Sequence, residues 1–160
     1  MTKILPFILV AAVACGGGPS PDVEADRAEI ARLLRGARTA HLDKRADLMT
    51  SGFADTVLIV AEGQVKAQTP DSMRRSMQAY FDRSSFQAWD DIEPPRIRVS
   101  PDGRMAWAIV HKRVELTAPD STGAVIAEHT EFAWVELYEK LDGRWRLVGV
   151  ASTDRPGIDG

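Results

Sequence analysis

Residues 138–150 read YEKLDGRWRLVGV, and this stretch decides the fold. Asp142-Gly143 stands between two β-rich runs, and Asp-Gly in that setting is a strong signal for a hairpin. Asp102-Gly103 repeats the pattern upstream, and Asp120-Ser121-Thr122-Gly123 marks a third turn between the two. These turns predict an antiparallel meander of four strands, at residues 86–99, 104–117, 124–140 and 144–153.

The predicted strands are much longer than the usual five or six residues. Because strands twist, a sheet made of long strands is expected to curl rather than stay flat. Pro94-Pro95 interrupts the first of the four strands, which confines that strand to a sheet edge or places a bulge there. The meander should therefore have a concave side.

The upstream half of the chain is predicted to be mainly helical. Apolar residues at spacings of three, four and seven indicate a helix from Pro21 to about His41, and a shorter helix is expected over residues 44–52. Thr69-Pro70 opens a third helix, since a capping threonine followed by proline is typical of a helix start. Between them, Glu62-Gly63 joins two short strands at residues 56–60 and 64–67. The fold class is therefore α+β, a curved antiparallel sheet wrapped around three N-terminal helices.

Two stretches carry a resemblance to a known superfamily. Residues 48–57, LMTSGFADTV, join a helix to a strand, and residues 142–148, DGRWRLV, open a last strand that contains tryptophan. Both resemble the nuclear transport factor 2-like (SnoaL-like) superfamily, and the likeness extends over residues 22–154. It implies a helix-lined cone. Because isomerases, dehydratases, epoxide hydrolases and non-catalytic proteins share that fold, the resemblance does not imply a particular activity.

The N-terminus is predicted to direct export. Lys3 precedes a ten-residue apolar run, which is the layout of a signal peptide over residues 1–14 and is too short to span a membrane. Ala12-Val13-Ala14-Cys15 resembles a bacterial lipobox, so Cys15 is expected to carry diacylglycerol and an N-acyl chain such as palmitate. The alternative is an ordinary Ala-x-Ala cleavage site with an incidental cysteine.

The residues after Cys15 favour the lipoprotein interpretation. Cys15 is the only cysteine and has no disulfide partner. Residues 15–21 then form a lipidated, flexible tether, and residues 22–157 form the folded domain. Gly16 follows the cysteine, and by resemblance to Gram-negative lipoproteins this favours the periplasmic face of the outer membrane. The membrane is thus one expected partner.

Composition excludes several function classes. The chain of 160 residues has 44% hydrophobic and 27% charged residues and a net charge of −3, as expected for an ordinary globular domain. Arg74-Arg75 is the nearest approach to a basic cluster, so no nucleic-acid partner is expected. The three histidines are far apart and no ligand pair has metal spacing, so neither a metal nor a cofactor is predicted.

Strand alternation suggests where a ligand would bind. In the second meander strand, odd-numbered and even-numbered residues fall on opposite faces, and both faces are apolar. One face should meet the helices and the other a second subunit, which predicts a homodimer through the sheet. The aromatic side is favoured for a pocket for a small hydrophobic ligand. Its predicted lining is Trp107, Ile109, His111, Thr130, Phe132, Trp134 and, from the first helix, His41. The alternative is that these aromatic residues are core and that the histidines are structural.

Two function classes remain open. The first is a membrane-anchored module that binds a small ligand or a partner protein, and the expected anchor favours it. The second is an isomerase, dehydratase or cyclase acting on a small hydrophobic cyclic substrate. By resemblance to dehydratase relatives, which pair histidine with aspartate, the catalytic candidates are His111 with Asp91 or with His129.

Overall fold

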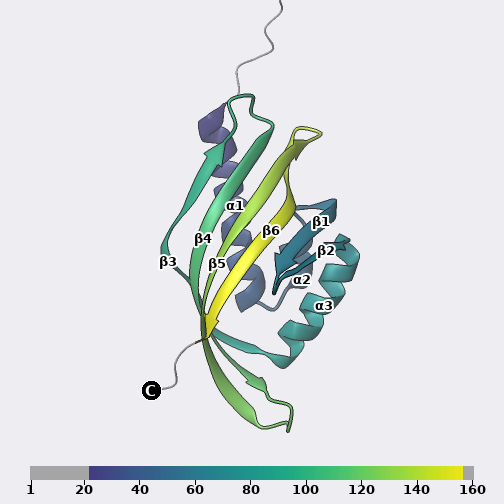
Figure 1. Ribbon diagram of the computed structural model, residues 1–160, viewed down its shortest axis with the longest axis vertical. Helices are drawn as coiled ribbons and strands as arrows, with labels where there is room; N and C mark the ends of the chain where they lie inside the picture. Colours follow the sequence, from purple (N-terminus) through teal and green to yellow (C-terminus); the bar gives the residue numbers. More distant parts are fainter. Residues whose placement is uncertain (1–21, 157–160) are drawn as a thin grey trace, which may run out of the picture.

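The structure is a computed structural model that describes residues 22–156. Long helices and strands account for most of this range, and Figure 1 shows the helices on one side of the curved sheet. The helices are α1 (Val23–Leu42), α2 (Ala46–Thr50) and α3 (Pro70–Arg83). The strands are β1 (Phe53–Ala61), β2 (Gln64–Gln68), β3 (Ser85–Val99), β4 (Met105–Pro119), β5 (Val125–Leu141) and β6 (Arg144–Pro156).

The six strands form one sheet in the order β2-β1-β6-β5-β4-β3. Strands β3 to β6 are the predicted antiparallel meander. The β1–β2 hairpin joins this meander through β6, which runs parallel to β1 and pairs Phe53 with Leu147. The predicted α+β fold with a curved sheet and N-terminal helices is therefore confirmed (Figure 1).

Two tight turns confirm the hairpin predictions. Glu62 and Gly63 have φ angles of 51° and 70°, and Asp142 and Gly143 have φ angles of 49° and 75°. Positive φ at both central residues is the geometry that matches the twist of a two-residue hairpin. The loop after Asp120 also forms as expected, because the Asp120 carboxylate accepts hydrogen bonds from the backbone N–H groups of Thr122 and Ala124 at 2.8 and 3.0 Å.

Helix α1 begins later than the sequence pattern predicts. Asp22 is its N-cap, with a carboxylate that accepts a hydrogen bond from the Ala25 N–H at 3.0 Å. Pro21, the predicted start, lies outside the described residues. Helix α3 begins where expected, with Thr69 as N-cap and Pro70 as the first helical residue. Both caps satisfy N–H groups that a helix start leaves unpaired.

The helices cover the even-numbered face of β4. Burial alternates along the whole strand, and the buried side chains are those of Ala106, Ala108, Val110, Lys112, Val114, Leu116 and Ala118. The favoured aromatic face, with Trp107 and Ile109, is the outer face of the sheet, and these two side chains are about 40% exposed. The assignment of this face to the cone is therefore wrong. Ala106 and Ala108 lie in one core cluster with Ile30 of α1 and Trp145 of β6, and their small side chains leave room for these larger groups.

One polar contact joins the start of α1 to the sheet. The buried Asp26 carboxylate accepts hydrogen bonds through Oδ1 from Trp145 Nε1 at 2.8 Å and from Lys140 Nζ at 2.5 Å. A buried carboxylate requires such partners, because its transfer out of water is otherwise costly. This contact fixes α1 across β5 and β6.

The predicted signal peptide, lipidated cysteine and tether lie outside the described residues. Within residues 22–156, no helix is both long enough and apolar enough to cross a membrane.

Candidate ligand-binding site

A cavity of about 710 Å³ lies between the helices and the concave face of the sheet. Its walls come from all three helices and from all six strands, and most of the side chains are apolar or aromatic. A cavity of this size suits a small organic ligand. The residues that define its chemistry are His41, Tyr80, Trp89, Phe132, Trp134, Glu136 and Tyr138.

Glu136 supplies a carboxyl group to this apolar cavity. Its Oε1 accepts a hydrogen bond from Trp134 Nε1 at 2.8 Å, and its Oε2 accepts a short hydrogen bond from the Tyr138 hydroxyl. Burial raises the pKa of Glu136, and the two donors and the positive charge of Lys112 oppose that rise. The residue is half-buried and lines the cavity wall.

His41 lies among aromatic rings near the end of α1. Its imidazole stacks on the Trp89 indole, and the rings of Phe81 and Phe86 approach it edge-on. Nδ1 lies 2.8 Å from the Ala37 carbonyl oxygen, which indicates that this nitrogen carries the proton and donates. Burial lowers the pKa of His41 to about 4, so the ring is neutral at pH 7. Because the ring is neutral, a charge interaction with the C-terminal end of α1 does not explain why a histidine occupies this position.

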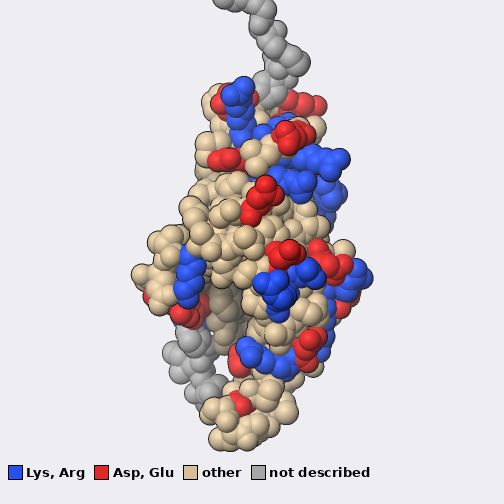
Figure 2. Space-filling model, turned by 90° about the vertical axis from the view of Figure 1, so that its right-hand side faces the viewer, with Lys and Arg blue, Asp and Glu red and all other residues tan. Residues whose placement is uncertain are grey.

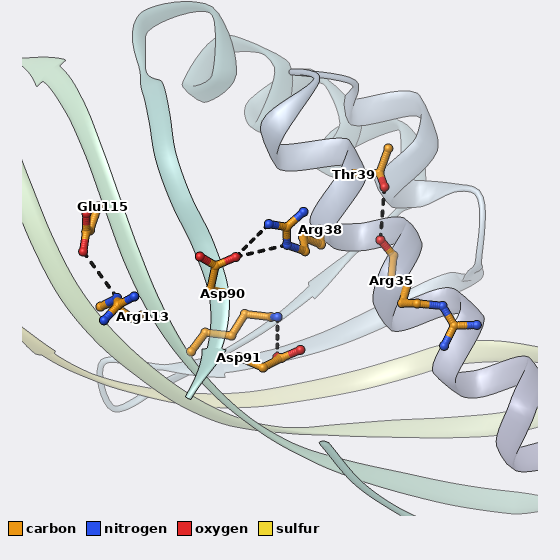
Figure 3. A network of polar contacts seen from close by, with 8 residues as sticks. Arg35, Arg38, Thr39, Asp90, Asp91, Arg113 and Glu115 are labelled. Atoms are coloured by element: carbon orange, nitrogen blue, oxygen red, sulfur yellow. Dashed lines mark hydrogen bonds and ion pairs between the residues drawn. The ribbon is translucent and has the colours of Figure 1, made fainter. Parts of the chain in front are cut away.

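A salt bridge between β4 and β3 lies against the Trp89 ring, and neither of its residues lines the cavity. Lys112 Nζ is 2.5 Å from Asp91 Oδ1 and lies over the Trp89 ring, 4.4 Å from its centroid. On the neighbouring residue, Asp90 accepts a hydrogen bond from Arg38 of α1 at 2.7 Å, and Figure 3 shows Asp90 and Asp91 side by side on the strand. The Arg38–Asp90 contact holds β3 against α1, and Asp91 pairs with the ammonium group of Lys112.

The structure brings only part of the predicted pocket together. Phe132, Trp134 and His41 line the cavity. Trp107, Ile109 and His111 lie on the opposite face of the sheet, because they pair with Leu137, Val135 and Ala133. Residues directly opposite in an antiparallel pair share a face, so Trp107 and Trp134 cannot both face the cone.

Thr130 lies on the concave face opposite Val114, beyond the residues that line the cavity. The proposed catalytic pairs do not form in the cavity either. Asp91 is bound to Lys112 on the concave side, and His111 lies 3.9 Å from Glu93 on the outer side. His129 is exposed, opposite Glu115. None of these three residues lines the cavity.

Sequence reasoning missed Glu136, Tyr138 and Trp89. The first two could have been found, since residues 132, 134, 136 and 138 of one strand share a face. Once Phe132 and Trp134 are placed in the cone, Glu136 and Tyr138 follow from the same alternation. Trp89 has no comparable signal, because irregularities in the β3–β4 register near Phe86 and Asp91 break the regular pattern.

Other site types find no support in the part of the chain that the structure describes. Residues 22–156 contain no group of three or more His, Cys, Asp or Glu side chains that could hold a metal ion. Figure 2 shows Lys and Arg side chains interspersed with Asp and Glu over the side of the molecule that carries α3. That side has no broad area of a single charge.

Comparisons with known proteins agree with this architecture. A ketosteroid isomerase-like protein from Erwinia carotovora is 16% identical, with a TM-score of 0.60 over 79% of this chain and 94% of that one. A proposed dehydratase of the NTF2-like family from Streptomyces avermitilis is 13% identical, with a TM-score of 0.62 over 84% and 99%. An NTF2-like protein from Cytophaga hutchinsonii is 13% identical, with a TM-score of 0.62 over 79% and 96%.

At these identities the solved structures show a shared fold and no more. None of the curated proteins matches the chain. The model of the SnoaL-like domain matches residues 29–152, which is most of the sequence and includes every residue of the cavity wall. The chain therefore belongs to the SnoaL-like domain family.

Proposed function

We propose that this protein binds a small, largely apolar molecule in the cavity between its helices and its sheet. The observation that carries the proposal is the cavity itself, with aromatic walls and one carboxyl group among the described residues that line it. Apolar walls with few polar groups are typical of sites that bury most of a ligand. The polar group then sets the orientation of the ligand.

Gly36 offers a direct test. It lines the cavity, and a Cβ atom added there would meet no heavy atom within 4 Å. Gly36→Trp would project an indole into the open space, and Gly36→Ala is its matched control. We expect naphthalen-2-ylmethanol and a panel of small cyclic alcohols to raise the melting temperature of the wild type and of Gly36→Ala. Gly36→Trp should lose this response. The proposal is rejected if no member of the panel binds the wild type.

We also propose that the protein acts at a membrane surface, attached through a lipid on Cys15. The support comes from the sequence, in which a signal-peptide pattern ends at the single cysteine and a glycine-rich tether follows. Labelling of cells with an alkyne analogue of palmitate tests this directly. We expect label on the wild type in the outer-membrane fraction and none on Cys15→Ala. An unlabelled wild type that fractionates with soluble proteins would contradict the anchor.

The outer face of the sheet is proposed to form a homodimer. Its exposed large apolar side chains are those of Leu58, Val60, Met105, Trp107, Ile109 and Leu137. These residues lie on β1, β4 and β5, and exposed apolar surface of this kind is typical of an interface. Light scattering at micromolar concentration should give twice the mass of one chain. Ile109→Lys should halve that mass, and a wild-type monomer would contradict the proposal.

A second candidate function is acid–base catalysis on a small cyclic substrate, as in an isomerase, dehydratase or cyclase. Glu136 favours it, because a carboxyl group in an apolar cavity with a raised pKa suits proton transfer. The test is the conversion of a cyclic β,γ-unsaturated ketone to its conjugated isomer, followed by ultraviolet absorbance. Glu136→Gln should abolish turnover, and Glu139→Gln on the outer face should retain it. A wild type without turnover on such ketones leaves the binding function as the better account.

A further inference from the structure

The negative and positive groups that line the cavity do not balance each other. Among the described residues that line it, Glu136 carries the only carboxyl group. Arg32 is the only guanidinium in the lining, and it is exposed to solvent. His41 is neutral at pH 7. An ionised Glu136 therefore gives the interior of the cavity a negative charge that the cavity wall does not balance.

The nearest buried cation is already paired. Lys112 is 2.5 Å from Asp91, and its side chain is only 3% exposed. The positive charge of Lys112 favours the ionised form of Glu136. Because the ammonium group is bound to Asp91, it is not the ion-pair partner of Glu136. A carboxylate accepts about four hydrogen bonds, and Glu136 receives one at each oxygen. Lone pairs on both oxygens thus remain available to a ligand.

Aromatic rings line the same cavity as this carboxylate. Trp89 and Trp134 lie with their ring centroids 5.7 Å apart, and Tyr80 and Phe132 line the same cavity. The face of an aromatic ring attracts a cation, and indole does so most strongly. Trp89 already receives one ammonium group, that of Lys112, on its ring. Rings and a carboxylate together form an environment for a positively charged group.

We propose that the cavity selects hydrophobic amines, with the protonated amine bound to Glu136 and the apolar body held between the helices and the sheet. This inference rests on the proposed ligand-binding function and gives the chemical class of the ligand. A carboxylate ligand would meet repulsion from Glu136. A neutral ligand of the same shape would shield the Glu136 charge from water without giving it a cationic partner.

The expected coupling between amine binding and the protonation of Glu136 also supports the selection of amines. Burial raises the pKa of Glu136, and a bound ammonium group would lower it again. The charged or titratable groups around Glu136 are Arg32 and His41 of α1, Tyr80 of α3, Lys112 of β4 and Tyr138 of β5. Tyr80 and Tyr138 have raised pKa values and stay protonated. Amine affinity should therefore fall as the pH drops and Glu136 becomes protonated, whereas the affinity of a neutral ligand should not.

Three probes with one apolar body test the inference by calorimetry on the purified protein. They are naphthalen-2-ylmethanamine, naphthalen-2-ylmethanol and 2-naphthoate. A charge-assisted hydrogen bond predicts that the amine binds the wild type roughly 10–100 times more tightly than the alcohol near neutral pH. The carboxylate should bind most weakly. Glu136→Gln should remove the preference for the amine, and Glu139→Gln, on the opposite face of β5, should keep it.

The outcomes separate this inference from the binding function on which it rests. If the alcohol binds as tightly as the amine, the selection of amines is wrong and the ligand cavity stands. If no probe binds, both are wrong. Should Glu136→Gln fail to fold, the wild type alone decides, because the amine-to-alcohol affinity ratio must fall between neutral pH and about pH 4. A ratio that stays constant over this range overturns the inference.

Discussion

The imidazole of His41 lies over the indole of Trp89, with ring centroids 4.0 Å apart and planes inclined by 19°. This contact joins the C-terminal turn of α1 to β3 at the edge of the cavity. It requires the neutral form of the ring, because the site is buried and Lys112 adds a positive charge nearby. Protonation of His41 should therefore weaken the packing of α1 against β3.

Acid should destabilise the protein through His41. The pKa of His41 falls from 6.5 to about 4 on folding, so the unfolded chain binds the proton first as the pH drops. Above about pH 6.5 both states are neutral and the group contributes nothing. Between about pH 6.5 and 4 the free energy of unfolding should fall, by about 3 kcal/mol in total. Urea unfolding of the wild type and His41→Phe across this range measures the difference. His129→Gln, at an exposed site, should follow the wild type.

The contact between Asp26 and Lys140 should stabilise the fold strongly. Lys140→Met leaves the buried Asp26 carboxylate with Trp145 as its one remaining donor. We expect a loss of about 3 kcal/mol, since an unpaired buried charge is costly. In the background of Asp26→Asn, the same Lys140→Met change should cost less than about 1 kcal/mol. Denaturant unfolding measures the free energy lost on Lys140→Met in each background. An equal loss in the two backgrounds would contradict the pairing of Asp26 with Lys140.

Gly36→Ala should stabilise the protein. Gly36 lies inside α1, and an added Cβ atom would meet open space. Alanine favours the helix over glycine by about 0.5–1 kcal/mol, so the melting temperature should rise by a few degrees. A lower melting temperature would show that the Cβ atom meets a neighbour after all. The same variant is the control for Gly36→Trp in the ligand experiments.

Gly143→Ala should have the opposite effect. Gly143 has φ at 75°, and its neighbour Asp142 also has a positive φ. An added Cβ atom meets no neighbour there either, so the difference from Gly36 is one of backbone conformation alone. An L-residue in the left-handed region costs about 1–2 kcal/mol. Thermal unfolding of the two alanine variants should therefore show shifts of opposite sign.

Turn chemistry made the sheet predictable. Asp142-Gly143 and Glu62-Gly63 occupy the left-handed conformations that such pairs favour, and the four strands of the meander follow from the turns. Local signals also placed the three helices, because caps and apolar spacing depend on a few neighbouring residues. The parallel contact between Phe53 and Leu147 has no local signal, since it joins residues that are far apart in the chain.

The cavity was harder to predict than the sheet. Alternation separates the two faces of β4 but does not say which face meets the helices, because both carry apolar residues. The outer face has the larger ones, such as Trp107, whereas the inner face has Ala106 and Ala108, which make room for α1. The volume of the side chains, rather than their hydrophobicity, therefore decides which face of β4 packs against the helices. The register between β4 and β5 then assigns Glu136 to the inner side, opposite Ala108.

The position of β6 between β5 and β1 has a consequence for assembly. Until Arg144 and the residues after it have left the ribosome or a translocation pore, the β1–β2 hairpin has no strand that connects it to the meander. Early intermediates should then consist of two separate pieces of sheet, each with an unpaired edge open to aggregation. Strand β6 completes the sheet, because it pairs with both β1 and β5. Pairing between strands that are far apart in the chain predicts slow, chaperone-sensitive folding.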